Sequence, residues 1–177
     1  MNKTQQIIAS METNLSRLQS RLPDLPVDGI MLNRLVLHLG REIAAALHQH
    51  IRPFGLAEPE FRVLTNLFAQ PQGMAHPSDL CVGAAQSPAS MSRICDALVE
   101  RNLITRVSSE QDRRRMVLRV TEQGEQLVRD LLPTLFKPLR AICAEFSDEE
   151  RQRLISLLKR LATIIEEVSA PSIERPA

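Results

Sequence analysis

The fold is decided by residues 103–121, which read LITRVSSEQDRRRMVLRVT. Apolar and polar residues alternate from Leu103 to Val107 and again from Met116 to Val120, which is the pattern of two half-buried strands. The eight residues between these strands are almost wholly polar, so we expect them to form a loop outside the core. Three adjacent arginines at the tip of such a hairpin repel one another unless a polyanion receives them, and DNA is the natural candidate.

A helix-turn-helix pattern precedes this hairpin. From Pro77 the chain divides into a short helix, a tight turn and a longer helix. Ser87 can cap the longer helix while Pro88 takes its first position, where the missing N–H costs nothing. Asn102 is expected to end it, because asparagine is the second choice after glycine for the left-handed residue beyond a helix. The longer helix therefore leads straight into the first strand.

The longer helix has a core face and an outward face. Its apolar residues recur at helical spacing and are expected to face the core; they are Met91, Ile94, Cys95 and Leu98. The outward N-terminal half is small and polar, which suits a helix whose first turns enter the major groove, where an arginine can reach a guanine edge. We therefore predict a DNA-facing edge that consists of Ser87, Ala89, Ser90, Ser92 and Arg93.

The net charge of +1 conceals a concentration of positive charge in this region. Residues 87–119 contain seven arginines (93, 101, 106, 113, 114, 115 and 119) and four acidic residues (96, 100, 110 and 112). A charge run alone is usually a solvated surface, but the preceding helix-turn-helix favours DNA. No apolar run approaches the ~18 residues of a membrane span and the N-terminus lacks a secretory pattern, so we expect a cytoplasmic protein with no membrane partner.

Three stretches together resemble the winged-helix signature of the MarR family of bacterial transcriptional regulators. They are SPASMSRI (87–94), LVERNLITR (98–106) and DRRRMVLRVTEQG (112–124), and the likeness extends from about Leu32 to Val168. The chain departs from the family at Asn102, where glycine is usual. Within the family, IMLNRLVLHL (30–39) and the N-terminal extension are most similar to repressors of multidrug efflux operons.

The resemblance implies that the hairpin is a DNA-binding wing. Arg113 and Arg114 would belong to its tip, and a wing arginine would enter the minor groove at A/T-rich steps. Asp112 would hold that arginine or the strand in place, although its position fits a simple turn residue equally well. Arg106 and Arg119, on the strands, would anchor the wing or reach phosphate.

The resemblance also implies an aromatic or phenolic inducer. We place its pocket where a long helix predicted for residues 28–51 meets the winged domain and the helix predicted for residues 121–143. The nominated contacts are Leu35, His38, Leu39, Phe61, Leu64 and Arg106. His38 has a simpler reading as a half-buried histidine among leucines. A redox switch through Cys81, Cys95 or Cys143 is an alternative, but an odd number of widely spaced cysteines is typical of small core residues in a reduced compartment.

The expected fold class is mainly α with a small β-hairpin wing, an α+β winged helix-turn-helix flanked by long N- and C-terminal dimerisation helices. Residues 1–25 are predicted to be a helical extension that packs across the dimer, residues 26–52 and 121–170 dimerisation helices, residues 53–120 the DNA-binding domain and residues 171–177 a flexible tail. Pro133 and Pro138 are expected to bend or break the helix after the wing, and Ser147 begins a capping box. A homodimer would require a pseudo-palindromic double-stranded operator with half-sites about 10 bp apart.

Enzyme readings find little support. The chain has no glycine-rich phosphate loop and no Gly-x-Ser-x-Gly motif, and we predict neither a cofactor nor a metal. His48 and His50 point to opposite sides of a helix, so they do not form a metal site while the helix is intact. The remaining alternative is a dimeric adaptor whose winged helix contacts protein rather than DNA.

Overall fold

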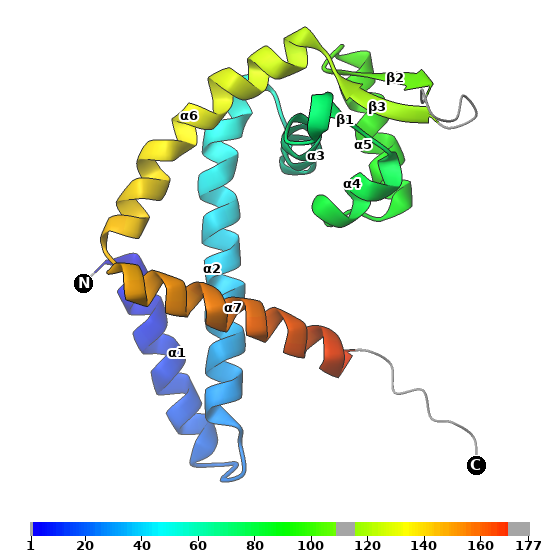
Figure 1. Ribbon diagram of the computed structural model, residues 1–177. Coiled ribbons are helices and arrows are strands. Elements are labelled where there is room, and N and C mark those ends of the chain that lie inside the picture. Colours follow the sequence, from blue (N-terminus) through cyan, green and yellow to red (C-terminus); the bar gives the residue numbers. More distant parts are fainter. Residues whose placement is uncertain (1, 109–115, 170–177) are drawn as a thin grey trace, which may run out of the picture. The chain divides into compact units, whose positions relative to one another are not determined.

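The structure, a computed structural model, describes residues 2–108 and 116–169 (Figure 1). Two compact units divide the chain, Met1–Leu131 and Leu132–Ala177. The predicted tail, residues 171–177, lies outside the described residues. The fold class predicted from the sequence is confirmed, because helices dominate and a small antiparallel sheet completes a winged helix-turn-helix.

The first unit begins with two long helices, α1 (Lys3–Gln19) and α2 (Val27–Ile51). The Asn2 side chain accepts from the Gln5 N–H at 2.9 Å and the Gln5 side chain accepts from the Asn2 N–H at 2.8 Å, a capping box that fixes the start of α1. Leu15 on α1 is buried, and α1 lies against α2 of the same chain. The prediction that the extension packs across a dimer did not include this contact within one chain.

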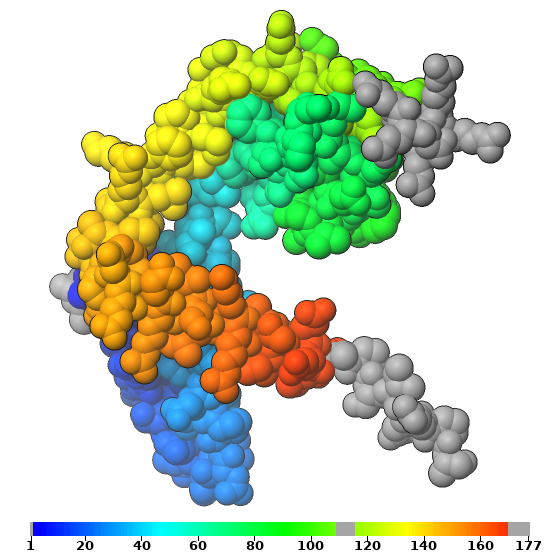
Figure 2. Space-filling model, viewed as in Figure 1, coloured from blue at the N-terminus to red at the C-terminus, as the bar shows by residue number. Residues whose placement is uncertain are grey.

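A compact head follows α2. It consists of η1 (Arg52–Phe54), α3 (Glu58–Phe68), η2 (Pro71–Gly73), β1 (Met74–Ala75), α4 (Pro77–Gly83), α5 (Pro88–Glu100), β2 (Ile104–Ser108) and β3 (Met116–Val120). The space-filling view shows the head as a continuous green mass (Figure 2). Its core side chains come from every layer and include Leu64, Leu67, Leu80, Met91, Leu98, Leu103, Ile104 and Leu118.

The sheet places the two long strands of the hairpin side by side. Its order is β1-β3-β2, and all neighbours are antiparallel. Ile104 pairs with Val120 and Ser108 with Met116, so β2 and β3 are paired as the two strands of the predicted hairpin, while Met74 of the short edge strand pairs with Arg119. β2 also lies against α5.

A junction of three residues connects the sheet to the next helix. Asn102 has φ 54°, the left-handed conformation predicted for the end of α5. Thr121 Oγ1 donates to the Asn102 carbonyl at 2.7 Å and accepts from the Gly124 N–H at 3.0 Å, so it caps the helix that follows. A Cβ on Gly124 would lie 2.0 Å from the Leu103 carbonyl oxygen, so glycine is required for this close approach.

Two long helices complete the chain, α6 (Glu122–Ala144) and α7 (Asp148–Ser169). α6 continues through Pro133 and Pro138, so neither proline breaks the helix. Each proline removes one backbone donor, but the two are five residues apart and the bonds between and around them can maintain the helix. The Ser147 capping box is confirmed, because Glu150 Oε2 accepts from the Ser147 N–H at 2.8 Å and Ser147 Oγ accepts from the Glu150 N–H at 3.2 Å. Hydrogen bonds from Ser147 to the Glu150 carboxylate lower the pKa of Glu150.

The described part of the chain contains neither a membrane-spanning helix nor a cluster of metal-ligating side chains. No described helix is long and apolar enough to cross a membrane. No three His, Cys, Asp or Glu side chains within residues 2–108 and 116–169 are grouped so that they would hold a metal ion.

Candidate nucleic-acid interface

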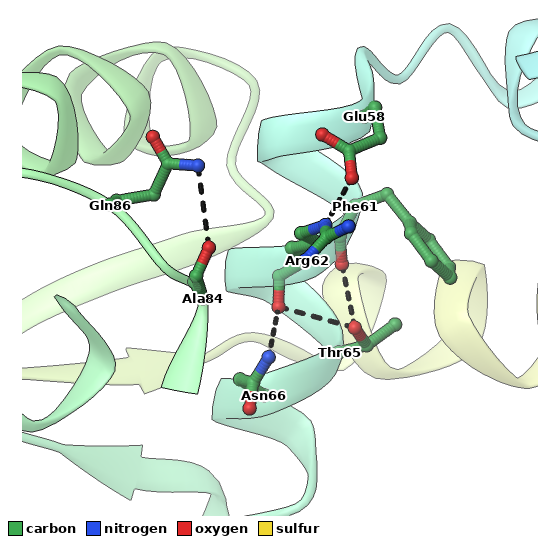
Figure 3. Close-up of polar contacts among 7 residues, drawn as sticks. All are labelled: Glu58, Phe61, Arg62, Thr65, Asn66, Ala84 and Gln86. Atoms are coloured by element: carbon green, nitrogen blue, oxygen red, sulfur yellow. Dashed lines mark hydrogen bonds and ion pairs between the residues drawn. The ribbon is translucent and has the colours of Figure 1, made fainter. Parts of the chain in front are cut away.

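The turn between α4 and α5 is held by local hydrogen bonds. Ala85 has φ 51°, and the Gln86 N–H donates to the Cys81 carbonyl at 2.9 Å. Gln86 Nε2 donates to the Ala84 carbonyl at 3.3 Å (Figure 3). These bonds fix the conformation of residues 84–87, the short connection between α4 and α5.

Helix α3 lies against the end of α4. Asn66 Nδ2 donates to the Arg62 carbonyl at 2.8 Å, and Thr65 Oγ1 donates to the Phe61 carbonyl at 2.7 Å (Figure 3). A Cβ on Gly83, the last residue of α4, would lie 2.9 Å from Asn66 Oδ1. A small residue at the end of α4 therefore lets the two helices approach closely.

The start and the core face of α5 agree with the sequence analysis. Ser87 Oγ accepts from the Ser90 N–H at 3.2 Å, which confirms the predicted cap. Of the predicted core residues Met91, Cys95 and Leu98 are buried, and Ile94 is half-buried.

The opposite face of α5 carries the residues predicted to contact DNA. Ser87, Ala89, Ser92 and Arg93 are exposed and Ser90 is half-buried. The first two turns therefore present small side chains and a single arginine, which allows a groove wall or a phosphate to come close to the helix backbone.

Some of the charged side chains on and beside α5 form ion pairs within the head, whereas Arg93 does not. Asp96 on α5 forms an ion pair with Arg106 on β2, which anchors the base of the hairpin to α5. Arg101, just beyond α5, lies 3.4 Å from Glu60 on α3. Arg93 is exposed and has no ion-pair partner among residues 2–108 and 116–169, so its charge is available to an outside anion.

The wing extends only in part into the described residues. Arg119 Nη2 lies 3.0 Å from Met74 Sδ, so this arginine contacts the edge strand of the sheet. The predicted wing residues Asp112, Arg113 and Arg114 lie outside the described residues. Their roles therefore stay predictions.

The six residues nominated for an inducer pocket have different surroundings in the single chain. Leu64 is fully buried in the head and His38 is buried on α2, whereas Leu39 on α2 is 52% exposed. Leu35 and Phe61 are half-buried. Arg106 borders a hollow of about 410 Å³ with Ser92 and Cys95, and none of the other five nominees lines that hollow.

The three cysteines differ in their surroundings, and all are free thiols. Cys95 is buried on α5, Cys81 is half-buried on α4 and Cys143 is exposed on α6. Burial raises the pKa of the Cys95 thiol, an effect that the nearby Arg106 guanidinium partly opposes. Cys95 therefore fits the core role rather than that of a reactive thiolate.

Two residues that organise the site were not singled out by the sequence analysis. Asp96 and Arg101 were only counted among the charged residues of the stretch 87–119. The spacing of ten residues between Asp96 and Arg106 contains no helical or strand period, and Arg101 contacts residues more than forty positions away. Such contacts become visible only in the folded chain.

The family model that matches the chain is described as MarR family and covers residues 54–115. The transcriptional repressor MprA of Escherichia coli is 27% identical over 92% of this chain and 93% of its own. A putative transcriptional regulatory protein for the hcr operon of Thauera aromatica is 33% identical over 76% of this chain and 82% of its own.

A solved structure supports the same assignment. AbsC, a MarR family transcriptional regulator from Streptomyces coelicolor, superposes with a TM-score of 0.73 at 25% identity. The superposition covers 81% of this chain and 97% of AbsC. The similarity therefore includes helices outside the head as well as the head itself.

Proposed function

We propose that this chain, which belongs to the MarR family of transcriptional regulators, acts as a homodimeric repressor. The dimer would bind a pseudo-palindromic operator, and a small aromatic or phenolic ligand would release it. The resemblance of residues 30–39 and of the N-terminal extension to repressors of multidrug efflux operons favours a multidrug efflux or stress operon as the target, and the repressor MprA matches nearly the whole length of the chain.

The exposed edge of α5 is the observation that carries this proposal. Asp96, Arg101 and Arg106 are tied to other parts of the head, whereas Arg93 is exposed and has no partner among the described residues. Small neighbours around Arg93 favour insertion of the helix into the major groove. We assign Arg113 and Arg114 to the minor groove and Asp112 to their support, as the family resemblance implies.

The dimer is supported by apolar side chains that the single chain leaves exposed. On α6 and α7 they include Phe136, Leu139, Ile142, Leu154, Leu157, Leu158, Ile165 and Val168. A monomeric soluble protein rarely exposes so many large apolar side chains on adjacent helices. A second copy of the chain would cover them and would place two α5 helices about one turn of duplex apart.

Release by a ligand requires that the ligand bind two states of the dimer unequally. A compound with equal affinity for DNA-competent and DNA-incompetent spacings of the two heads shifts nothing. We keep Leu35, His38, Leu39, Phe61, Leu64 and Arg106 as the nominated contacts. Each of these residues can be tested separately by substitution.

Fluorescence anisotropy tests the proposal directly. The labelled probe is a duplex from the region upstream of the protein's own gene, and the comparison is a duplex of the same composition in shuffled order. We expect tight, salt-dependent binding to one pseudo-palindrome, and release by salicylate or 2,4-dinitrophenol. Weak binding that is indifferent to sequence would contradict the proposal and favour a protein partner.

Replacing Arg93 by alanine is expected to weaken operator binding about tenfold to a hundredfold, because one base or phosphate contact is lost. The thermal midpoint should not change, since the side chain is exposed and makes no described ion pair. Anisotropy over a range of salt gives the affinity, and its salt slope separates a phosphate contact, which reduces the slope by about one counterion, from a base contact.

Arg17→Ala is the matched control for this substitution. Arg17 is an exposed arginine in the last turn of α1, so its removal changes the net charge equally but leaves α5 intact. We expect the control to bind the operator within about twofold of the unmodified protein. Equal losses in both variants would mean that Arg93 acts only through net charge.

A further inference from the structure

The guanidinium of Arg101 connects α5 to the segment that follows α2. Arg101 Nη1 donates to the Gly55 carbonyl at 2.9 Å, and Nη2 donates to the Phe54 carbonyl at 3.3 Å. Nη1 also lies 3.4 Å from Glu60 Oε2 on α3. One side chain thus contacts three acceptors that lie in the segment between α2 and the first turn of α3.

The segment that Arg101 contacts, residues 51–60, is short and is held by hydrogen bonds of its own. α2 ends at Ile51, which is fully buried, and η1 follows at once. Gly55 has φ 69° and its N–H donates to the Arg52 carbonyl at 2.9 Å. Glu60 Oε2 also accepts from the Ala57 N–H at 2.8 Å, so it completes the start of α3. These hydrogen bonds fix the conformation of the segment from Ile51 to Glu60, so its carbonyls can orient the Arg101 guanidinium.

Arg101 lies at the end of α5 that is farther from the predicted DNA-facing residues. The predicted DNA-facing residues occupy the first two turns of α5, whereas Arg101 is the C-cap at the opposite end. Within residues 2–108 and 116–169, only the hydrogen bonds of Arg101 join α5 or its cap to residues 51–60. A cation there also suits the negative end of the helix dipole.

We propose that Arg101 is a positioning residue that fixes the direction of α5 relative to the end of α2, and that it thereby sets which spacing of half-sites the dimer accepts. This inference rests on the proposed function, because it concerns the same DNA-binding helix. In a dimer, α2 and the terminal helices set the separation of the heads, and the Arg101 contacts carry that separation to α5. Arg101 itself does not touch DNA.

The mechanism follows from the geometry of the contacts. Two planar N–H groups that bind successive carbonyls resist rotation of α5 about the end of η1, whereas a single flexible ammonium resists it less. Without these contacts, apolar packing alone would hold the C-terminal end of α5 against the segment that follows α2, while the Asp96–Arg106 ion pair and the Thr121–Asn102 bond would still join it to the sheet and to α6. The head would still fold, but α5 would sample more directions and the dimer would tolerate operators of the wrong spacing.

Three duplexes test this inference. One has the natural half-site spacing, and the others have one base pair added or removed at the centre. Binding is measured by anisotropy below the thermal midpoint for the unmodified protein, Arg101→Met, Arg101→Lys and the control Arg62→Met. Arg62 is an exposed arginine on α3 that pairs with Glu58 within one helix, so its removal leaves the α5 contacts intact.

We expect Arg101→Met to bind the natural duplex about tenfold more weakly, with an unchanged salt slope and with a preference for the natural spacing reduced several-fold. Arg101→Lys should lie between Arg101→Met and the unmodified protein, and Arg62→Met should match the unmodified protein. A salt slope lowered by about one counterion would overturn the inference in favour of a direct phosphate contact. An unchanged spacing preference would overturn it in favour of a merely structural role.

The outcomes also separate this inference from the proposed function. If the unmodified protein binds all three duplexes equally and weakly, the proposed function fails, and the role of Arg101 fails with it. If the unmodified protein discriminates between spacings and Arg101→Met discriminates equally well, only the inference about Arg101 fails.

Discussion

Alanine at position 124 is expected to lower the free energy of unfolding by about 3 kcal/mol. The added Cβ would lie 2.0 Å from the Leu103 carbonyl oxygen and 2.9 Å from Val120 Cγ2. Neither neighbour can yield at low cost: Leu103 is buried, and its carbonyl accepts from the Thr121 N–H at 3.1 Å. Relief of the clash would therefore break the junction between α5, the sheet and α6.

Thermal and urea unfolding measure this effect. A loss of about 3 kcal/mol corresponds to a midpoint about 6–12 °C lower for a chain of this size. Gly40→Ala is the matched control, because a Cβ at Gly40 within α2 meets nothing within 4 Å. That control should gain up to about 1 kcal/mol from reduced backbone entropy in the unfolded chain. A stable Gly124→Ala protein would mean that the junction can shift as a unit.

Glutamate in place of Leu158 is expected to raise the dimer dissociation constant at least about a hundredfold. Leu158 lies on the apolar face of α7 and is 49% exposed in the single chain. Burial of a leucine contributes about 2 kcal/mol, and the substitution replaces it with a carboxylate that the interface would have to desolvate. A symmetric dimer carries the change twice, so the effects on the two copies add.

Analytical ultracentrifugation measures the dissociation constant, and anisotropy reports the accompanying loss of operator binding. Ser156→Glu introduces the same charge on the polar face of α7, where Ser156 is exposed, and should leave both quantities near those of the unmodified protein. A monomeric unmodified protein, or a Leu158→Glu variant that dimerises normally, would contradict the proposed dimer. Far-UV circular dichroism checks that α7 remains helical.

Local signals predicted the head well. Ser87 and Asn102 mark the two ends of α5 in the sequence, and the structure has a cap at the first and a left-handed residue at the second. Ser147 predicted the start of α7 equally well. In each case the residue acts on backbone groups within a few positions, so its neighbours in sequence contain the information.

Other features depend on contacts that no local pattern contains. Pro133 and Pro138 predicted a bend or a break, and the structure has one continuous helix, α6, through both prolines. Arg101 reaches the carbonyls of Phe54 and Gly55 across more than forty residues, and such a pairing requires the folded head. The nominated inducer contacts were chosen from helix faces alone, which do not show whether residues from different helices meet at one hollow.

The division of α5 into a buried face and an exposed face has a consequence for evolution. Met91, Cys95 and Leu98 maintain the head, whereas Ser92 and Arg93 make no contribution to its core. Substitutions on the exposed face are therefore nearly neutral for folding, while substitutions on the buried face are constrained. After gene duplication, a new operator preference can evolve in small steps through folded intermediates, without compensating mutations elsewhere in the chain.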